Sequence, residues 1–342
     1  MPEFARLRSW LERRWYGPGP PLLLRPPAAM YALLVRLRRA AYARGSRASR
    51  HPGLPVVVIG NIVAGGTGKT PLAIWLAQAV RAAGQRPGVA LRGYGGRVAV
   101  PRLVAAGDDP AAVGDEAVLV ARRAAVPVAV GADRVAAARL LAGQGCTVVI
   151  CDDGLQHLAL RRDVAIAVID GARGFGNGAL LPAGPLREPV AMLDACDLVV
   201  INGEDSTGAA GARPALRMTI EPAPLRCLIS GPEEPLERLR GESVHAVAGI
   251  GHPQRFFGLL RSLGARPVEH AFPDHHAYRI ADLDFGDSRR IVMTEKDAVK
   301  CAAFARQRMW YLPVSASLPD ADAARLLGAV LAKLPGGGAS HA

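Results

Sequence analysis

The sequence is poor in the residue types on which several classes of protein depend. It has five cysteines, an odd number with no C-x-x-C spacing, which argues against a disulfide framework or a structural zinc site. Aromatic residues make up only 5%, and no continuous apolar run reaches the roughly 20 residues of a membrane-spanning helix. The 342 residues suit two domains. We therefore expect a folded chain with buried free thiols in the reducing cytosol.

Lysine is also scarce, and the positive charge is unevenly spread. Of 42 basic residues only Lys69, Lys296, Lys300 and Lys333 are lysines. The formal net charge is +12, yet residues 1–50 alone carry 11 arginines and two acids, so the rest of the chain is nearly balanced. A basic segment of this kind favours an anionic partner, either a membrane surface or a nucleic acid.

The basic segment also carries apolar and aromatic side chains at helical spacing. Trp10 and Trp15 lie among arginines in the first stretch, and residues 30–42 mix Leu, Val and Tyr with Arg again. This pattern is typical of an amphipathic helix at a membrane interface, but it also fits a helix that packs its apolar face on the protein body. We expect residues 1–45 to form a membrane-associating arm, and the two kinds of contact are compatible.

A phosphate-binding loop is predicted directly after the first apolar strand. Residues 55–59 read Pro-Val-Val-Val-Ile, and Gly60-Asn-Ile-Val-Ala-Gly-Gly-Thr-Gly-Lys-Thr70 and a helical run follow. Strand, glycine-rich loop, Lys-Thr and helix form the P-loop arrangement, although Val63 replaces its first glycine. Lys69 would reach the β- and γ-phosphates and Thr70 would bind Mg²⁺. The residues expected to surround the phosphates are Gly65, Gly66, Thr67, Gly68, Lys69 and Thr70.

Downstream of the loop, buried β-branched runs alternate with helical patterns. This alternation predicts an α/β fold of the P-loop NTPase type, with a mainly parallel sheet and helices on both faces. We expect a core domain over residues 46–222, a smaller second α/β domain over 223–335, and a mobile tail over 336–342. Ligands of such folds gather at the carboxyl ends of the strands.

Several polar clusters fall at those strand ends. Asp152 and Asp153 follow an apolar strand, where a carboxylate can hold Mg²⁺ opposite Thr70, although a solvated turn would look the same. Arg187 could face phosphates, and Glu188 could complete a metal site. Further along, four residues form a cluster that fits a zinc site, an acid–base pair or a surface loop: His270, Asp274, His275 and His276.

Seven motifs in series resemble the tetraacyldisaccharide 4′-kinase family, the lipid A 4′-kinases. That family's own P-loop has valine at the position of Val63. The motifs run in order over about residues 55–300: Gly60-Asn61 with Gly-Gly-Thr-Gly-Lys-Thr70, Arg92-Gly-Tyr-Gly95, Gly114-Asp-Glu116, Asp152-Asp-Gly-Leu-Gln-His157, Leu181-Pro-Ala-Gly-Pro-Leu-Arg-Glu188, Phe272-Pro-Asp-His-His276 and Thr294-Glu-Lys-Asp297.

The resemblance implies transfer of the γ-phosphate of ATP to the 4′-hydroxyl of a tetraacyl glucosamine disaccharide 1-phosphate. Asp115 would be the base, and His275 or its neighbour His276 would partner it from the second domain. The remaining roles implied are Lys69 in catalysis, Thr70, Asp152, Asp153 and Glu188 on Mg²⁺, and Asn61, Arg92, Gln156 and Arg187 on substrate or nucleotide.

The resemblance also implies a location. A lipid-anchored substrate and a basic arm place the protein on the cytoplasmic face of the bacterial inner membrane, as a peripheral or monotopic protein at an anionic surface. We expect no nucleic-acid partner and no obligate protein partner. The alternatives from sequence are a soluble P-loop ATPase that acts as a partner switch, and a nucleic-acid-binding NTPase that uses the basic arm.

Overall fold

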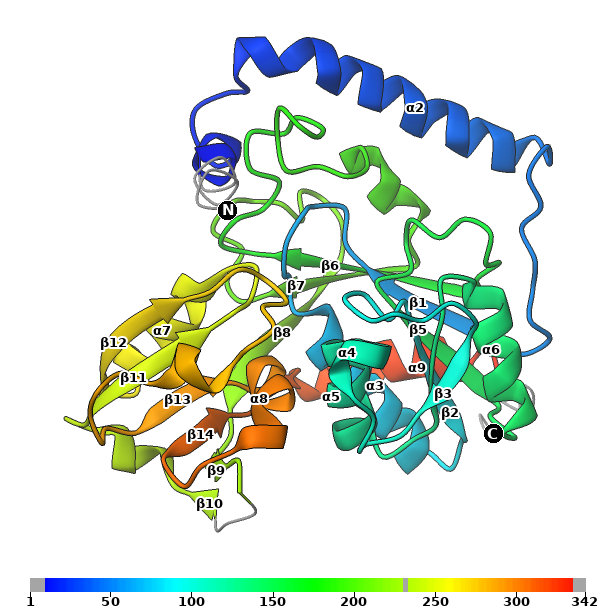
Figure 1. Ribbon diagram of the computed structural model, residues 1–342. Helices are drawn as coiled ribbons and strands as arrows, with labels where there is room; N and C mark the ends of the chain where they lie inside the picture. The colour runs from blue at the N-terminus through cyan, green and yellow to red at the C-terminus, as the bar shows by residue number, and fades with distance from the viewer. Residues whose placement is uncertain (1–9, 230–232, 335–342) are drawn as a thin grey trace.

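The computed structural model describes residues 10–229 and 233–334, which form two α/β units side by side (Figure 1). The first contains a nine-stranded sheet that is parallel except at its two edge strands, β15 and β3. The predicted α/β class with a mainly parallel sheet is therefore confirmed. In sheet order the strands are β15 (Val314–Ser317), β8 (Ala215–Pro222), β7 (Leu198–Asn202), β6 (Val164–Asp170), β1 (Val56–Gly60), β5 (Val148–Asp152), β2 (Pro87–Leu91), β4 (Val128–Val130) and β3 (Arg102–Val104).

Helices cover both faces of this sheet, because its central strands are apolar on both sides. In β1, Val57 and Ile59 face one core, and Val56 and Val58 face the other. The first core is covered by α3 (Lys69–Ala82), α5 (Asp115–Ala124) and α9 (Asp320–Leu331), and the second by α6 (Arg134–Gly143) and the short helix η2 (Val190–Ala195). The helix α4 (Pro110–Val113) leads into α5.

The second unit has a six-stranded sheet with a helix on each face. Phe256 and Phe257 of α7 (Pro253–Ser262) fill one core, and Ala298 and Cys301 of α8 (Glu295–Cys301) fill the other. The strands in order are β10 (Glu233–Glu234), β9 (Leu225–Cys227), β14 (Met309–Leu312), β13 (Ile291–Thr294), β11 (Ser243–Ala248) and β12 (Arg266–Ala271). The short helices η3 (Leu236–Leu239), η4 (Ile280–Leu283) and η5 (Ala302–Phe304) complete the unit.

The chain returns to the first unit at its C-terminal end, which corrects the predicted boundary of the second domain. The predicted range 223–335 includes β15 and α9, but β15 pairs with β8 and α9 packs against α3. The apolar side chains of Leu326 and Val330 are fully buried in the first core, so α9 completes that core rather than the second. The predicted tail over 336–342 lies outside the described residues.

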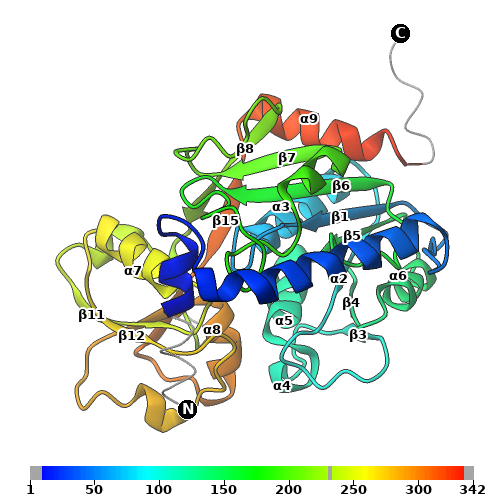
Figure 2. The same ribbon diagram turned by 90° about the horizontal axis from the view of Figure 1, so that it is seen from above.

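The basic arm forms a long helix laid across the first unit. Residues 10–15 are helical, and η1 (Leu22–Leu24) leads into α2 (Arg25–Ala43). Figures 1 and 2 show α2 running along the outside of the core, and Ala28 is its single buried residue. The start of the predicted arm, residues 1–9, lies outside the described residues. Within the described ranges, no helix is long and apolar enough to cross a membrane.

Candidate active site

The P-loop joins the end of β1 to the start of α3, as the sequence predicts. Its tight turn depends on glycine at two positions: Gly65 has φ 103° and Gly68 has φ 96°, both in the left-handed region. A Cβ at position 68 would also lie 2.7 Å from Nδ2 of Asn202. That amide, at the end of β7, donates to the carbonyl of Thr67 at 3.0 Å. The loop is therefore fixed by its own glycines and by a neighbouring strand.

A carboxylate suited to a metal ion lies beside Thr70. The Thr70 hydroxyl donates to Oδ2 of Asp152 at 2.7 Å, while the buried Oδ1 has no hydrogen-bond partner among the described residues. Burial and the nearby charge of Glu116 raise the pKa of Asp152 to about 6. A buried carboxylate oxygen without a partner, next to the P-loop hydroxyl, fits Mg²⁺, which prefers one or two carboxylates plus phosphate and water oxygens.

Asp153 is held by two cations. Lys69 Nζ lies 3.4 Å from Oδ1 of Asp153, and the Arg187 guanidinium lies 3.1 Å from the same atom. Burial alone would raise the pKa of Asp153, but Lys69 and Arg187 outweigh it and hold that pKa well below its usual range. Asp153 also has φ 51°, a strained conformation for a residue other than glycine. The carboxylate and both cations are thus concentrated where phosphate would lie.

Three of the four predicted substrate residues form one network. Asn61 is fully buried and accepts a hydrogen bond from Arg187 on its side-chain oxygen. Gln156 donates to the backbone carbonyl of Asn61 at 2.8 Å. The fourth, Arg92, is exposed after the end of β2 and has no described contact with this network.

Glu188 is buried but does not join the predicted metal ligands. Its carboxylate pairs with Arg39 of α2 at 3.4 Å, and no described contact links it to Thr70 or Asp152. The same helix reaches the neighbouring residue, because the Tyr31 hydroxyl donates to the carbonyl of Arg187 at 3.0 Å. The geometry therefore places Glu188 where the arm contacts the loop that carries Arg187 and Glu188. No described contact supports a role of Glu188 in metal binding.

The two domains meet at Asp115 and His275. Asp115 begins α5 and is 4% exposed, and its two carboxylate oxygens lie 3.1 and 3.0 Å from Nδ1 of His275. Burial would raise the pKa of Asp115, but the His275 hydrogen bond and Lys296 outweigh it and lower that pKa. The alternative residue, His276, is turned to Asp282 at 3.2 Å. Of the two adjacent histidines, the structure brings His275 to Asp115.

The histidines of the predicted cluster do not converge on a common point. His270 contacts Nδ1 of His245 at 2.9 Å and stacks on Phe285, away from His275. Among the residues that the structure describes, no group of three or more His, Cys, Asp or Glu side chains could hold a metal ion. The zinc interpretation of this cluster therefore has no structural basis.

Sequence reasoning missed three cations at the site. Arg173 donates to the P-loop carbonyl of Gly66 and to Asp170 at 3.1 Å, and Arg255 of α7 reaches the same carboxylate at 3.0 Å. Nothing in the sequence distinguishes these arginines from the others. Lys296 lies beside His275. The sequence could have singled out Lys296, because lysine is rare in this chain.

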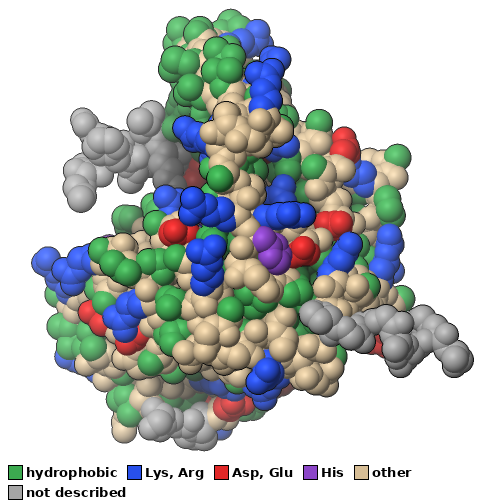
Figure 3. Space-filling view, turned by 90° about the vertical axis from the view of Figure 1, so that its right-hand side faces the viewer, with side chains coloured by type: hydrophobic (Ala, Val, Ile, Leu, Met, Phe, Trp, Pro, Cys, Tyr) green, Lys and Arg blue, Asp and Glu red, His purple; other side chains and the backbone are tan. Residues whose placement is uncertain are grey.

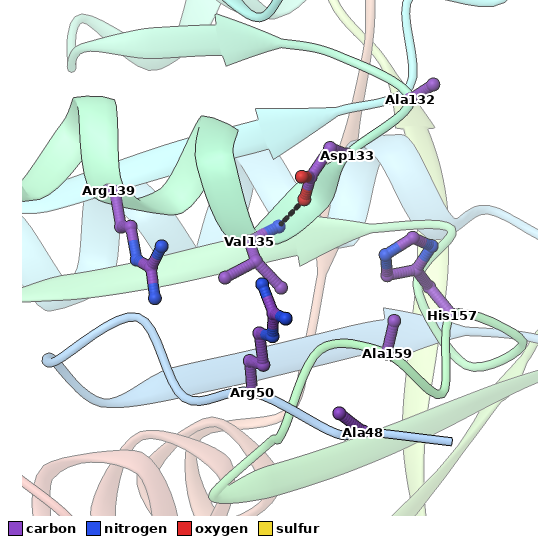
Figure 4. A pocket seen from close by; sticks show the side chains of 8 residues that line it. All are labelled: Ala48, Arg50, Ala132, Asp133, Val135, Arg139, His157 and Ala159. Carbon is purple, nitrogen blue, oxygen red and sulfur yellow. Dashed lines mark hydrogen bonds between the residues drawn. The ribbon is translucent and has the colours of Figure 1, made fainter. Parts of the chain in front are cut away.

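A separate pocket of about 430 Å³ lies beside the start of α6 (Figure 4). None of the predicted site residues lines it. Its lining is Ala48, Arg50, Ala132, Asp133, Val135, Arg139, His157 and Ala159.

A glycine-rich loop of the phosphate-binding type, together with a buried Asp–His pair from two domains, is typical of a P-loop phosphotransferase. The model of the tetraacyldisaccharide-1-P 4′-kinase family matches residues 21–332. The chain belongs to this family, and it is a lipid A 4′-kinase that transfers the γ-phosphate of ATP to the 4′-hydroxyl of the tetraacyl disaccharide 1-phosphate. The partner-switch and nucleic-acid alternatives therefore give way to the kinase prediction.

Individual relatives agree with the family match. The tetraacyldisaccharide 4′-kinase of Alkalilimnicola ehrlichii is 53% identical over 91% of this chain and 92% of its own length. That of Methylobacillus flagellatus is 49% identical over 93% and 95%. A crystal structure of LpxK from Aquifex aeolicus in complex with ATP superposes with a TM-score of 0.72 at 27% identity, covering 88% of this chain and 96% of that one.

Proposed function

We propose that the P-loop and the carboxylates at the end of β5 hold ATP with Mg²⁺. The amides of residues 65–68 and the Lys69 ammonium bind the β- and γ-phosphates, as in other P-loops. Thr70 and Asp152 hold Mg²⁺, with Asp153 beside them. The bound ion neutralises charge on the phosphates. Support comes from the unpartnered Oδ1 of Asp152 beside the Thr70 hydroxyl.

Asp115 accepts the proton of the attacking 4′-hydroxyl, and His275 orients it. The observation that carries this assignment is the contact of 3.0 Å between His275 of the second domain and a buried carboxylate at the start of α5. Phosphoryl transfer depends mainly on positioning and charge neutralisation, so a fixed, ionised base needs only to receive the proton. The second domain, which contacts the first at this pair, would exclude water from the site.

Arg187, Asn61, Gln156 and Arg92 contact substrate or nucleotide in this proposal. The first three already share hydrogen bonds beside the P-loop. Arg187 is released from Asp153 when phosphate competes for its guanidinium, because a guanidinium binds phosphate in a bidentate manner.

The arm places the enzyme on an anionic membrane, at the cytoplasmic face of the inner membrane where its lipid-anchored substrate would lie. The outer face of α2 exposes Met30, Leu33, Leu34 and Leu37, in which the adjacent leucines 33 and 34 lie three or four residues from each of the other two. Figure 3 shows hydrophobic and basic side chains side by side on the lobe at the top of the molecule. A helix with leucines outward and arginines beside them matches an interfacial anchor. The proposed partners are the lipid substrate and this surface, without an obligate protein partner or nucleic acid.

Replacement of each member of the pair tests the catalytic assignment. Asp115→Ala and His275→Ala should each lower kcat by about 10²–10⁴-fold, the usual range for general acid–base catalysis, with little change in ATP affinity. His276→Ala, in the same loop but bound to Asp282, is the matched control and should keep its turnover within about threefold. Full turnover by His275→Ala would overturn the pairing across domains.

A further inference from the structure

The helix α8 turns two lysines toward the Asp115–His275 pair. Lys296 Nζ lies 3.1 Å from Oε1 of Glu116, 3.3 Å from Oδ1 of Asp274 and 3.4 Å from Nε2 of His275. Glu116 belongs to the first domain, whereas Lys296 and Asp274 belong to the second. The ammonium therefore bridges the two domains and contacts the imidazole nitrogen opposite the one that faces Asp115.

The choice of lysine at this position is informative in this chain. Only four of the 42 basic residues are lysines, and three of these, Lys69, Lys296 and Lys300, lie at the site. Arginine is the default cation elsewhere, so these positions need a property that arginine lacks. An ammonium is compact and can direct its donors to three separate acceptors, whereas a guanidinium is planar and larger.

The contacts of Lys296 determine where His275 carries its proton. An ammonium can only donate, so the Nε2 atom that faces it must accept and must lack a proton. The single proton of the neutral ring is then on Nδ1, from which it is donated to Asp115. Asp274 is the one acceptor that would favour the opposite tautomer, but it lies 3.7 Å from Nε2 and closer to Lys296.

The groups around the ring agree with a neutral imidazole. A second ring proton would point an N–H group at the ammonium of Lys296. That ammonium stays protonated, because the carboxylates of Glu116, Asp115 and Asp274 raise the pKa of Lys296 and outweigh the effect of burial. The ring of Tyr94 covers His275 at a centroid distance of 4.6 Å. The charged groups facing the imidazole are Asp115 and Glu116 from α5, Lys296 and Lys300 from α8, and Asp274 from its own loop.

We propose that Lys296 is a positioning residue that fixes His275 as the neutral tautomer protonated at Nδ1, so that Asp115 stays ionised and aimed as the proton acceptor. This inference rests on the roles proposed for Asp115 and His275. It adds a third residue to the pair and assigns a function to the Thr294-Glu-Lys-Asp297 motif.

Nitrogen NMR of the full chain labelled with ¹⁵N-histidine tests the tautomer directly. The His275 signals are assigned by their loss in His275→Gln. At pH 7 the wild type should show a protonated Nδ1 and an unprotonated Nε2, and Lys296→Met should shift the ring toward the other tautomer or the imidazolium. A wild-type ring protonated at Nε2, or a tautomer unchanged in Lys296→Met, would overturn the proposal. The wild-type spectrum decides the matter even if the variant folds poorly.

Kinetics separate positioning from a merely structural role. Lys296→Met should lower kcat by about tenfold, because Asp115 and His275 lose the contact that fixes the position of the ring proton. The KM for ATP should stay within about twofold, and Lys296→Arg should be intermediate. Lys333→Met, at an exposed lysine after α9, is the control and should match the wild type. A raised KM for ATP with an unchanged kcat would refute the positioning role.

The proposed function of the Asp115–His275 pair and the proposed role of Lys296 can be refuted separately. Full turnover by His275→Ala would refute the proposed function of the pair, whatever tautomer the ring adopts. The ring tautomer is measured without turnover, so a wrong tautomer would refute the role of Lys296 alone.

Discussion

The leucines on the outer face of α2 should contribute directly to membrane binding. Leu33, Leu34 and Leu37 are 53%, 58% and 57% exposed, so each has about half of its side chain available to a bilayer. Burying a whole leucine side chain is worth about 1.5–3 kcal/mol, so each of the three should contribute about 1 kcal/mol. Replacing all three with Gln, which keeps the helix propensity, should therefore weaken binding to vesicles by about 3 kcal/mol, or roughly 100-fold.

Co-sedimentation with vesicles containing anionic lipid measures this difference. Leu140→Gln is the matched control, because Leu140 is a 37% exposed leucine on α6, outside the arm. Its partition coefficient should equal that of the wild type. A triple variant that bound vesicles within about threefold of the wild type would show that this face of α2 does not enter the bilayer.

Three further predictions follow from the site. Gly68→Ala should lower the free energy of unfolding by about 1–3 kcal/mol and weaken ATP binding, because the position has φ 96° and a Cβ there would lie 2.7 Å from Asn202. Chemical denaturation measures the first effect and nucleotide titration the second. Wild-type values in both would show that the substitution causes no strain. Asp152→Asn should raise the Mg²⁺ concentration needed for half-maximal turnover by about tenfold or more, and an unchanged Mg²⁺ dependence would remove Asp152 from the metal site. Asp115→Asn should be less stable than the wild type at pH 7. Because folding lowers the pKa of Asp115, its ionised form stabilises the fold above the unfolded value of about 3.9, and this advantage should disappear as the pH of urea unfolding falls through the lowered pKa of the folded state.

The first unit could largely be predicted from sequence, because its central strands are short apolar runs and those that form the site are followed by glycine or acidic residues. The run at residues 55–59 forms β1, and the Asp-Asp pair at the end of β5 lies at the carboxyl edge of the sheet, where the P-loop also begins. The edge strand β15 escaped prediction. Its sequence, Val-Ser-Ala-Ser, has little apolar alternation, and it is defined by its pairing with β8, nearly 100 residues earlier.

The candidate site was predictable where a residue type is unusual and not where it is common. Asp115 and His275 lie in distinctive motifs, whereas Arg173 is one arginine among many and its contact with Gly66 depends on tertiary structure. Glu188 shows what motif spacing leaves out. Its motif predicts a metal ligand, whereas the contact that the structure describes is with Arg39, a partner 149 residues away that spacing along the chain cannot reveal.

The central claim is that Asp115 receives the proton of the sugar hydroxyl while the P-loop holds ATP. The most direct test follows transfer of label from γ-labelled ATP to tetraacyl disaccharide 1-phosphate in mixed micelles, for the wild type and Asp115→Asn. The account predicts a 4′-phosphorylated product from the wild type and a rate at least about 100-fold lower for the variant, with equal ATP affinity. Transfer by Asp115→Asn within tenfold of the wild-type rate would contradict it.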